Sequence, residues 1–311
     1  MTLTISFDTC PAPALAAGQE SESLADWIAE NPGWESPFYQ YGYMLFRGFR
    51  ITSLSAFETA IQAIMRPSLE FAEETSPRSQ LSDHAYTSTD YPPSYPIQFH
   101  HEFSYRRSYP ARLAFCCLRP AHSGGATPLA DSRKVLRRLP ADVVARFDRL
   151  GVRYVRNFGE MGVSWQDSFG ETSKEKVSGY CRDNGIAHTW SGDYLHTCQE
   201  APATIEHPVT GERTWFNSVM NLNVCGIEPE PVREALRLLP EDSLPTNTYY
   251  GSGEPVEPAV IELLRQAYAE EAVRLEWQCG DLLLIDNVLT AHARDPFEGP
   301  RKVITAMGYA R

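Results

Sequence analysis

Long hydrophobic runs are missing from this sequence, and so is any excess of positive charge. No stretch approaches the roughly 18 apolar residues that a membrane-spanning helix needs. Residues 1–7 lack the charged segment and the apolar core of a secretory signal. Asp and Glu number 40 against 28 Lys and Arg, which gives a formal net charge of −12. This balance excludes the basic stripe of a typical nucleic-acid-binding protein, so we expect no nucleic-acid and no membrane partner.

Two metal or disulfide patterns are also absent. The seven cysteines show no Cys-x-x-Cys pair and no regular spacing, which indicates a reducing compartment, and we expect a cytoplasmic protein. The His-Glu-x-x-His helix of many zinc hydrolases is missing as well. What is present is ordinary globular composition, with 42% apolar and 22% charged residues over 311 positions. That length suits one large domain.

Short strand-like segments and helical segments share the chain. The pattern predicts an α+β fold with a mostly β core, an antiparallel sandwich with a large helical and strand insert at about 132–272 and flanking helices. Residues 1–20 look irregular, and no linker divides the chain, so we expect one domain over 1–311. A polar segment at about 73–95 is long enough to act as a lid over a site. The strands are expected at 43–48, 98–105, 111–118, 273–277, 281–293 and 302–309, with a turn and a short strand at 124–131 and strand-like segments alternating with turns over 151–158 and 186–217. The helices are expected at 21–30, 54–65, 132–139, 141–150, 173–183, 229–239 and 255–272.

The stretch Gln98–Tyr105 puts an imidazole and a carboxylate close together. It has the alternation of a strand, so His100 and Glu102 share one face while His101 points to the other. Non-haem Fe(II) oxygenases bind iron through two histidines and one carboxylate, which leaves open coordination positions. One His-x-Glu pair alone is more often a surface or hydrogen-bonded pair, so a third ligand is needed.

His292 is the best candidate for that ligand. It follows the apolar run 280–287, and a histidine at the end of a buried strand is held rigidly, as a metal ligand must be. A core histidine bonded to a neighbour is the plainer alternative. The remaining histidines lie in polar segments where surface positions account for them: His84, His122, His188, His196 and His207.

Arg301 stands after a Pro/Gly turn, at the entry of the last apolar strand. An unpaired guanidinium is costly to bury, so it needs a carboxylate partner. A dicarboxylate co-substrate could provide one through a bidentate pair, and an ordinary salt bridge to an acidic residue remains equally open. The neighbouring Lys302 turns to the opposite face of the strand.

These segments together resemble one family. The stretches 100–102, 124–131 and 292–301, in that order and spacing, are similar to the TauD/TfdA family of Fe(II)/2-oxoglutarate dioxygenases, and within it to the SyrP-like branch. The similarity runs from about Tyr43 to the C-terminus. It implies a double-stranded β-helix, or jelly roll, with a large insert between core strands.

The resemblance also implies ligands and roles. Iron would be held by His100, Glu102 and His292, and the distal carboxylate of 2-oxoglutarate by Thr127 and Arg301. O2 would be the second co-substrate. Glu102 argues against a halogenase, because halogenases of this superfamily replace the carboxylate by a small residue so that chloride can bind. Two positions depart from the family pattern. They are His101, where relatives commonly carry Asn, and the segment 218–223, where many carry histidine or aromatic residues.

The implied reaction is hydroxylation of an unactivated C–H in an amino acid or an amino-acid derivative, free or bound to a carrier protein, in natural-product biosynthesis. Desaturation, epoxidation or cyclisation would use the same iron ligands. A non-catalytic jelly-roll binding protein and a zinc hydrolase are more remote alternatives. The residues expected to line the substrate pocket are Tyr105, Arg107, Phe216 and Asn217. The identity of the substrate and the oligomeric state stay open.

Overall fold

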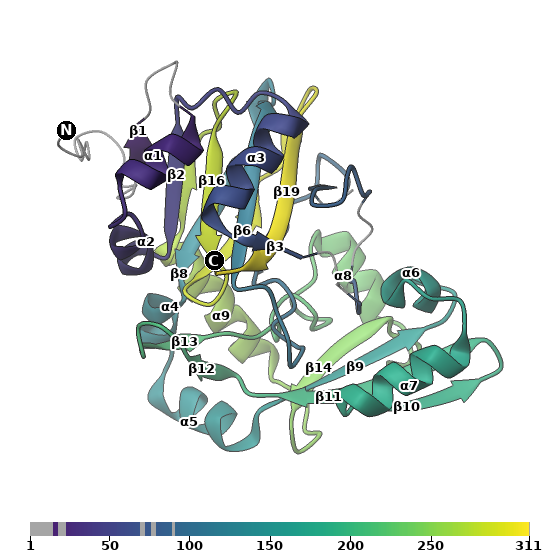
Figure 1. Cartoon of the computed structure of the whole chain (residues 1–311). Helices are drawn as coiled ribbons and strands as arrows, with labels where there is room; N and C mark the ends of the chain where they lie inside the picture. Colours follow the sequence, from purple (N-terminus) through teal and green to yellow (C-terminus); the bar gives the residue numbers. More distant parts are fainter. Residues whose placement is uncertain (1–14, 18–22, 69–71, 76–78, 89–90, 311) are drawn as a thin grey trace.

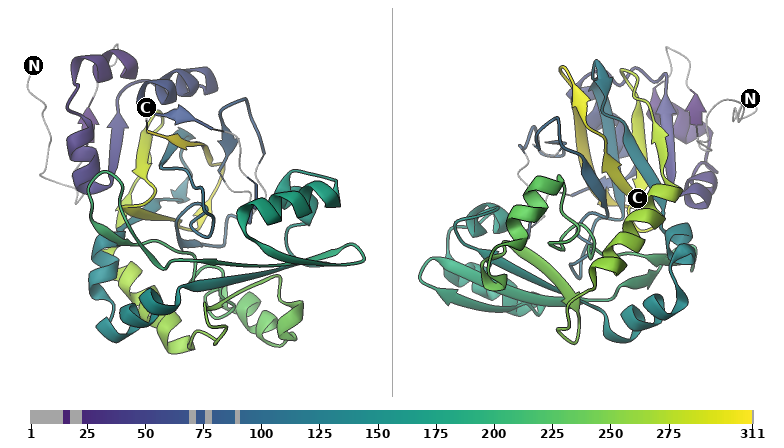
Figure 2. Two further views of the ribbon diagram at one scale, coloured as in Figure 1. Left: turned by 60° about the horizontal axis from the view of Figure 1, so that its bottom comes forward. Right: turned by 180° about the vertical axis from the view of Figure 1, so that it is seen from behind.

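Two facing sheets form the centre of the molecule (Figures 1 and 2). The computed structural model describes residues 15–17, 23–68, 72–75, 79–88 and 91–310. The larger sheet contains, in order, β1 (Leu15–Ala17), β2 (Tyr43–Arg47), β16 (Leu282–Asp286), β6 (Arg112–Arg119), β19 (Lys302–Tyr309) and β3 (Arg66–Pro67), with β4 (Tyr86–Thr87) also paired to β19. The smaller sheet contains β15 (Val273–Leu275), β8 (Thr127–Asp131), β17 (Thr290–Arg294) and β5 (Ile97–His100). A short pair, β7 (Ser123–Gly124) and β18 (Phe297–Glu298), lies beside them.

The strand β16 shows why the larger sheet is apolar on both faces. Leu283 and Ile285 belong to the core between the two sheets, together with Phe115 and Ala291. Leu284, which points the other way, belongs to a second core on the outer face of the same sheet. A strand buried on both faces reads as a continuous apolar run rather than an alternating one, which is how residues 282–285 appear in the sequence.

Three N-terminal helices cover that outer face (Figure 1). The side chain of Ser53 caps α3 by accepting a hydrogen bond from the backbone N–H of Ala56. Buried aromatic side chains of the three helices then pack on the sheet, among them Trp27, Phe38 and Phe57. The helices are α1 (Leu24–Glu30), α2 (Glu35–Tyr41) and α3 (Leu54–Ile64).

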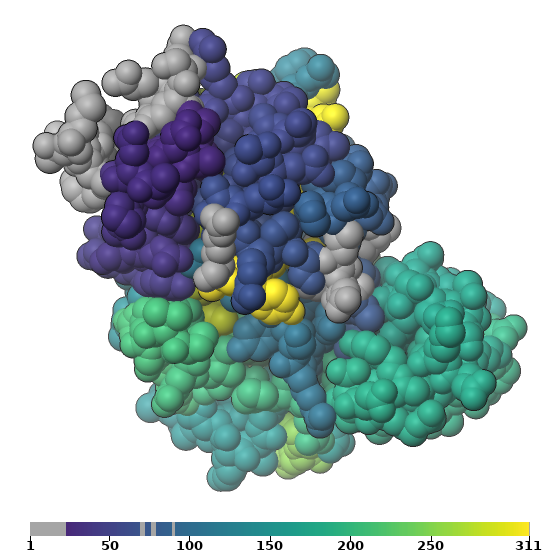
Figure 3. Space-filling model, in the orientation of Figure 1, coloured from purple at the N-terminus to yellow at the C-terminus, as the bar shows by residue number. Residues whose placement is uncertain are grey.

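Between β8 and β15 the chain leaves the two sheets. This insert carries its own four-stranded sheet, in the order β10-β11-β9-β14, with α7 packed on it, and α9 packs back against β8 (Figure 2). In the space-filling view the insert occupies the lower part of the molecule, below the N-terminal helices (Figure 3). Its elements are α4 (Ser132–Arg138), α5 (Ala141–Leu150), β9 (Val152–Phe158), α6 (Trp165–Phe169), α7 (Lys174–Asn184), β10 (Ala187–Ser191), β11 (Tyr194–Ala201), β12 (Thr204–Glu206), β13 (Arg213–Trp215), α8 (Glu230–Arg237), the 3-10 helix Glu241–Ser243, β14 (Thr246–Tyr250) and α9 (Pro258–Glu271).

The α+β prediction with an antiparallel sandwich is confirmed, but two predicted strands were wrong in extent. The strand expected over 98–105 ends at His100, and residues 101–108 form turns in which Phe103 has φ 55°. The strand expected over 281–293 is two strands in different sheets. Asp286 causes this break, because its Oδ1 accepts hydrogen bonds from the backbone N–H groups of Val288 and Leu289 and closes a turn.

Two further expectations concern the start of the chain and membrane-spanning helices. The irregular start expected at 1–20 lies outside the described residues, apart from the strand β1. In the part of the chain that the structure describes, no helix is long and apolar enough to cross a membrane.

Candidate active site

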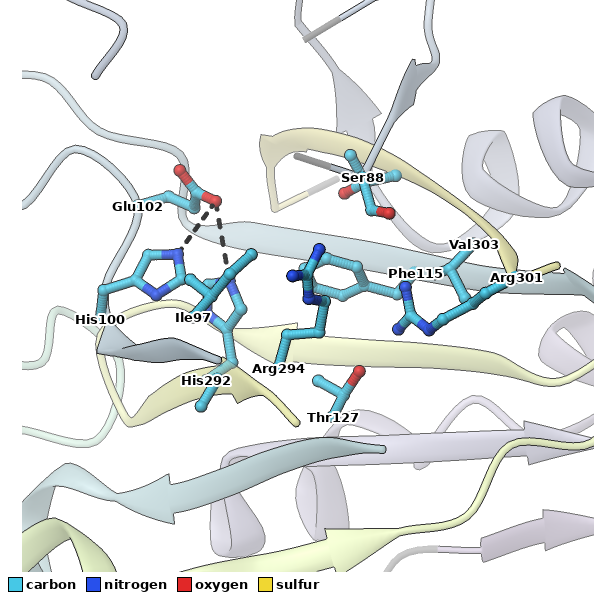
Figure 4. Close-up of a pocket in the computed structure, with 12 residues that line it drawn as sticks. Ser88, Ile97, His100, Glu102, Phe115, Thr127, His292, Arg294, Arg301 and Val303 are labelled. Atoms are coloured by element: carbon cyan, nitrogen blue, oxygen red, sulfur yellow. Dashed lines mark ion pairs between the residues drawn. The ribbon is translucent and has the colours of Figure 1, made fainter. Parts of the chain in front are cut away.

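Three side chains from two distant parts of the chain meet at one edge of the smaller sheet (Figure 4). His100 is the last residue of β5 and His292 lies opposite it on β17, so the two ring centroids are 4.2 Å apart. Glu102 follows in the turn, with its Oε1 3.7 Å from His100 Nε2 and 3.6 Å from His292 Nε2. One ligand atom from each residue falls within 4.8 Å of the others.

The ring of His100 is held in a defined tautomer. Its Nδ1 lies 2.8 Å from the backbone carbonyl oxygen of Gln98. A carbonyl can only accept, so Nδ1 carries the proton and Nε2 is left with a free lone pair on the side of Glu102. This is the arrangement that a metal-binding histidine commonly has, with the second nitrogen bonded to a backbone carbonyl.

A buried amide fixes the turn that carries Glu102. The Oδ1 of Asn287 accepts a hydrogen bond from the backbone N–H of Glu102 at 2.9 Å, and its Nδ2 donates to the Glu102 carbonyl at 2.9 Å and to the Pro110 carbonyl at 2.8 Å. Asn287 is fully buried. Glu102 therefore owes its position to this amide and not to the strand alternation predicted from the sequence.

His101 lies outside the cluster, as the sequence predicts. Its Nδ1 bonds to the Asn287 carbonyl at 2.6 Å, and its Nε2 lies 3.0 Å from the hydroxyl of Ser132. Burial lowers the pKa of His101 to about 3, so the ring is neutral at ordinary pH. It is a structural bridge between the Glu102 turn and the start of α4.

Arg301 and Thr127 line a cavity that begins at the three-residue cluster (Figure 4). The Nε of Arg301 donates to the Gly125 carbonyl at 3.1 Å. Burial, and then the charge of Arg294, lower the pKa of Arg301 to about 10, so the guanidinium still carries its charge at neutral pH. Gly125 has φ +72°, and a Cβ there would lie 3.0 Å from Arg301 Cδ, so this approach requires glycine.

The hydroxyl of Thr127 is directed by an indole. Trp277 Nε1 lies 3.1 Å from Thr127 Oγ1. The indole N–H can only donate, so Oγ1 is the acceptor and its own proton remains available to an oxygen in the cavity. Together, Thr127 and Arg301 offer a hydroxyl donor and a cationic donor at the end of the cavity away from the cluster.

Arg294 lines the same cavity and holds its wall. Its guanidinium donates to the carbonyls of Tyr91, Pro92 and Tyr95 at 3.1, 2.8 and 2.8 Å. These three bonds tie the segment 91–95, part of the expected lid, to β17. The sequence analysis gave Arg294 no role, because nothing in the sequence identifies the carbonyls it would meet.

A second cavity opens on the other side of the cluster and shares His100 and Glu102 with the first. Tyr105 lines it and donates a hydrogen bond to the Glu73 carbonyl at 2.6 Å. Among the described residues lining this cavity there is neither Lys nor Arg. The residues around it are Glu74, Thr75, Tyr91, Pro96, Ile97, Gln98, His100, His101, Glu102, Phe103, Tyr105, Ser218, Asn221, Leu222, Ile227, Glu228 and Thr246.

Three residues expected in the substrate pocket lie elsewhere. Arg107 is exposed and lines a separate small cavity beside Gly185. Phe216 packs against His101, with ring centroids 4.9 Å apart, and the amide of Asn217 donates to the Ala203 carbonyl. The segment that follows them, 218–223, does line the cavity, through Ser218, Asn221 and Leu222.

His207 corrects another expectation. The sequence favoured a surface position, but the side chain is buried and its Nε2 lies 3.0 Å from Asp286 Oδ2. His207 thereby holds the Asp286 carboxylate, whose other oxygen closes the turn between β16 and β17. The signal that sequence reasoning missed is Asp286, a carboxylate directly at the end of an apolar strand, which needs a buried partner.

The family model described as "Taurine catabolism dioxygenase TauD, TfdA family" matches residues 14–307. The chain belongs to the TauD/TfdA family. It is accordingly an oxidoreductase of the dioxygenase class that uses Fe(II), 2-oxoglutarate and O2.

Proteins similar to this chain match it over nearly its whole length. The chain is 34% identical over 300 residues to the dapdiamide synthesis protein DdaC of Enterobacter agglomerans, which covers 96% of this chain and 91% of that protein. Two solved structures share the fold. They are an Fe and alpha-ketoglutarate dependent oxygenase, PvcB, from an isonitrile synthetic pathway (TM-score 0.54, 12% identity, 95% and 85% coverage) and an asparagine oxygenase in complex with Fe(II), 2S,3S-3-hydroxyasparagine and succinate (TM-score 0.54, 15% identity, 91% and 79% coverage).

Proposed function

We propose that His100, Glu102 and His292 bind Fe(II), and that Thr127 and Arg301 bind the distal carboxylate of 2-oxoglutarate. The observation that carries this proposal is the meeting of two imidazoles and one carboxylate within 4.8 Å, with Arg301 and Thr127 along one adjoining cavity. The donor set fits Fe(II), which accepts nitrogen and carboxylate ligands on one face and keeps the remaining positions open.

Each group then has a defined task in the reaction. Bound iron supplies the oxidising chemistry, in which the keto acid loses CO2 to give succinate and one oxygen atom is used on the substrate. Arg301 pairs with the distal carboxylate, and the Thr127 hydroxyl donates a hydrogen bond to the same group. These two contacts orient the keto acid towards the three ligands. Glu102 occupies the carboxylate position that a halogenase leaves free, so the site favours hydroxylation.

The substrate that we propose is an amino acid or an amino-acid-derived small molecule, with natural-product biosynthesis as the setting. DdaC is a dapdiamide synthesis protein and the asparagine oxygenase structure holds a hydroxyasparagine, and both support this class. The cavity lined by Tyr105 would receive the substrate, next to His100 and Glu102. Desaturation, epoxidation and cyclisation remain the alternative outcomes of the same chemistry.

We further propose a cytoplasmic enzyme whose substrate can be presented on a carrier protein. The six cysteines in the described residues are free, which suits a reducing compartment. DdaC, a dapdiamide synthesis protein, supports a natural-product setting in which a carrier-bound substrate is one form that the cavity lined by Tyr105 would receive.

The test is metal reconstitution under anaerobic conditions. Purified protein is loaded with Fe(II) and 2-oxoglutarate, exposed to oxygen, and assayed for succinate, while a parallel sample is loaded with zinc. We expect succinate from the iron form alone. Stoichiometric zinc binding without any succinate from the iron form would instead favour a hydrolase. A protein that binds neither metal and forms no succinate would instead be a non-catalytic jelly-roll protein.

A further inference from the structure

Two buried polar atoms in the cavity lined by Tyr105 have no hydrogen-bond partner in the structure. They are Oε1 of Gln98 and Oγ1 of Thr246, and both residues line this cavity beside the iron site. Buried polar atoms are almost always paired in folded proteins, so an unpaired one needs a reason. A reason that applies here is a ligand that completes the pair.

The orientation of the Gln98 amide is fixed by its neighbour. Its Nε2 donates to the carbonyl of Gly226, and a carbonyl can only accept. Oε1 is therefore the end of the amide left unpaired at the cavity, and it offers acceptor capacity alone. Gln98 precedes His100 by two positions on β5, so strand alternation puts both side chains on the same face.

Thr246 lines the cavity from the insert, at the first position of β14. Residues 224–226 are hydrogen-bonded next to both side chains. The carbonyl of Gly226 accepts a hydrogen bond from the Gln98 amide, and the side chain of Asn247, which follows Thr246, accepts one from the backbone N–H of Val224. The two unpaired atoms thus belong to well-supported positions.

The charges around this cavity have one sign. Glu74 and Glu228 line it, and the described lining residues include no Lys or Arg. Glu228 is paired with Arg233 at 3.0 Å, but that guanidinium does not line the cavity. A substrate carboxylate entering here would meet the carboxylates of Glu74 and Glu228 and no Lys or Arg side chain, which is unfavourable. An ammonium group would meet the Gln98 acceptor, the Thr246 hydroxyl and those two carboxylates.

We propose that Gln98 Oε1 and Thr246 Oγ1 bind the amino group of an amino-acid-derived substrate whose own carboxyl group is masked as an amide or a thioester. This inference rests on the proposed function and adds to it the chemical class of the substrate. Gln98 and Thr246 are specificity-determining residues in this account, while the iron ligands and Arg301 carry out the shared chemistry.

A matched panel of compounds tests the substrate class. Iron-loaded protein is supplied with 2-oxoglutarate, O2 and the twenty common amino acids as free acids, as carboxamides and as N-acetyl carboxamides, and succinate formation is measured. We expect stimulation by one or more carboxamides, with the corresponding free acid and N-acetyl compound at least tenfold weaker. Equal or stronger stimulation by a free acid or an N-acetyl compound would overturn the proposal.

The panel also separates the two levels of the account. No response to any carboxamide, with substrate-independent succinate formation intact, would overturn the substrate class and leave the oxygenase function standing. Absence of succinate under every condition would contradict the proposed function, and this inference would fall with it.

Single substitutions then test the two residues. Thr246→Val keeps the shape and removes the hydroxyl, so the KM of the stimulating carboxamide should rise about tenfold, the value of one hydrogen bond to a charged group. Thr246→Ser should restore it, and Gln98→Leu should raise it similarly, all with an unchanged KM for 2-oxoglutarate. Thr189→Val, on the insert strand β10, is the matched control. Wild-type KM for the carboxamide in both Thr246→Val and Gln98→Leu would refute the assignment.

Discussion

In the proposed site, Arg301 is the residue expected to contribute most to the binding of 2-oxoglutarate. Its guanidinium lines the cavity with Thr127, and its Nε is already bonded to Gly125, which leaves the terminal nitrogens for a ligand. The substitution Arg301→Met keeps the apolar stem and removes the charge. We expect the KM for 2-oxoglutarate to rise ten- to a hundredfold, because a charge-assisted hydrogen bond contributes about 1.5–3 kcal/mol.

The adjacent residue provides the control for that measurement. Lys302 is exposed on the other face of β19, so Lys302→Met should leave the KM for 2-oxoglutarate as in the wild type. An unchanged KM in Arg301→Met would show that another cation binds the keto acid, and Arg294 would be the next candidate.

Asn287 positions Glu102, one of the three proposed iron ligands, through its backbone alone. Its amide holds both the N–H and the carbonyl of Glu102, so Asn287→Ala frees the turn. We expect Fe(II) affinity to fall about 10- to 100-fold, the usual effect of losing a supporting bond around a metal ligand. Equilibrium binding of Fe(II) under argon measures this.

A general loss of stability would also weaken metal binding, so a second asparagine is compared. Asn157 in β9 likewise donates its amide to a backbone carbonyl, that of Leu244, within the insert. Asn157→Ala should leave the Fe(II) affinity at the wild-type value. Equal losses in the two variants would mean that Asn287 acts through stability alone.

At the scale of elements, Arg294 links β17 to the segment 91–95. Three backbone carbonyls of that segment depend on one guanidinium. Replacing it by methionine should loosen the segment, and amide hydrogen exchange at Tyr95, whose N–H is bonded to the Pro92 carbonyl, should become faster. Arg274→Met is the control, since Arg274 is exposed and pairs with Asp295. If the exchange rate is the same in both variants, Arg294 does not hold the segment.

Elements were predicted well where a periodic pattern continued and poorly where it was interrupted by buried polar groups. The apolar run of β16 and the capped helices at 54 and 132 had clear local signals. The end of β5 at His100 had none, because the hydrogen bonds of the turn that follows come from a residue far away in the sequence. The turn after Asp286 did have a local signal, the Asp286 carboxylate, which the apolar pattern around it concealed. Asn287 is 185 positions from Glu102 and still decides its backbone conformation.

The same distinction applies to the site. His100, Glu102 and His292 were recognisable by residue type and order, and Thr127 and Arg301 by resemblance to a family. Gln98, Thr246, Arg294 and Trp277 carry no local signal, since each is defined by the atom it faces in the fold. Arg107, Phe216 and Asn217 show the opposite error, since each was expected in the pocket and each lies outside it in the fold.

At the scale of the whole molecule, the two proposed binding cavities are built from three parts of the fold. The smaller sheet supplies both histidines, the larger sheet supplies Phe115 and the approach to Arg301, and the insert supplies Thr246. All the proposals above depend on the three clustered residues binding the iron needed for turnover.

One measurement tests that claim most directly: the succinate formed per chain when Fe(II)- and 2-oxoglutarate-loaded protein is exposed to oxygen. The wild type is compared with His100→Ala, Glu102→Ala and His292→Ala, and with His188→Ala in the insert strand β10 as a control. The account predicts succinate from the wild type and from His188→Ala, and none above background from the other three. Wild-type succinate from His100→Ala or His292→Ala would contradict it.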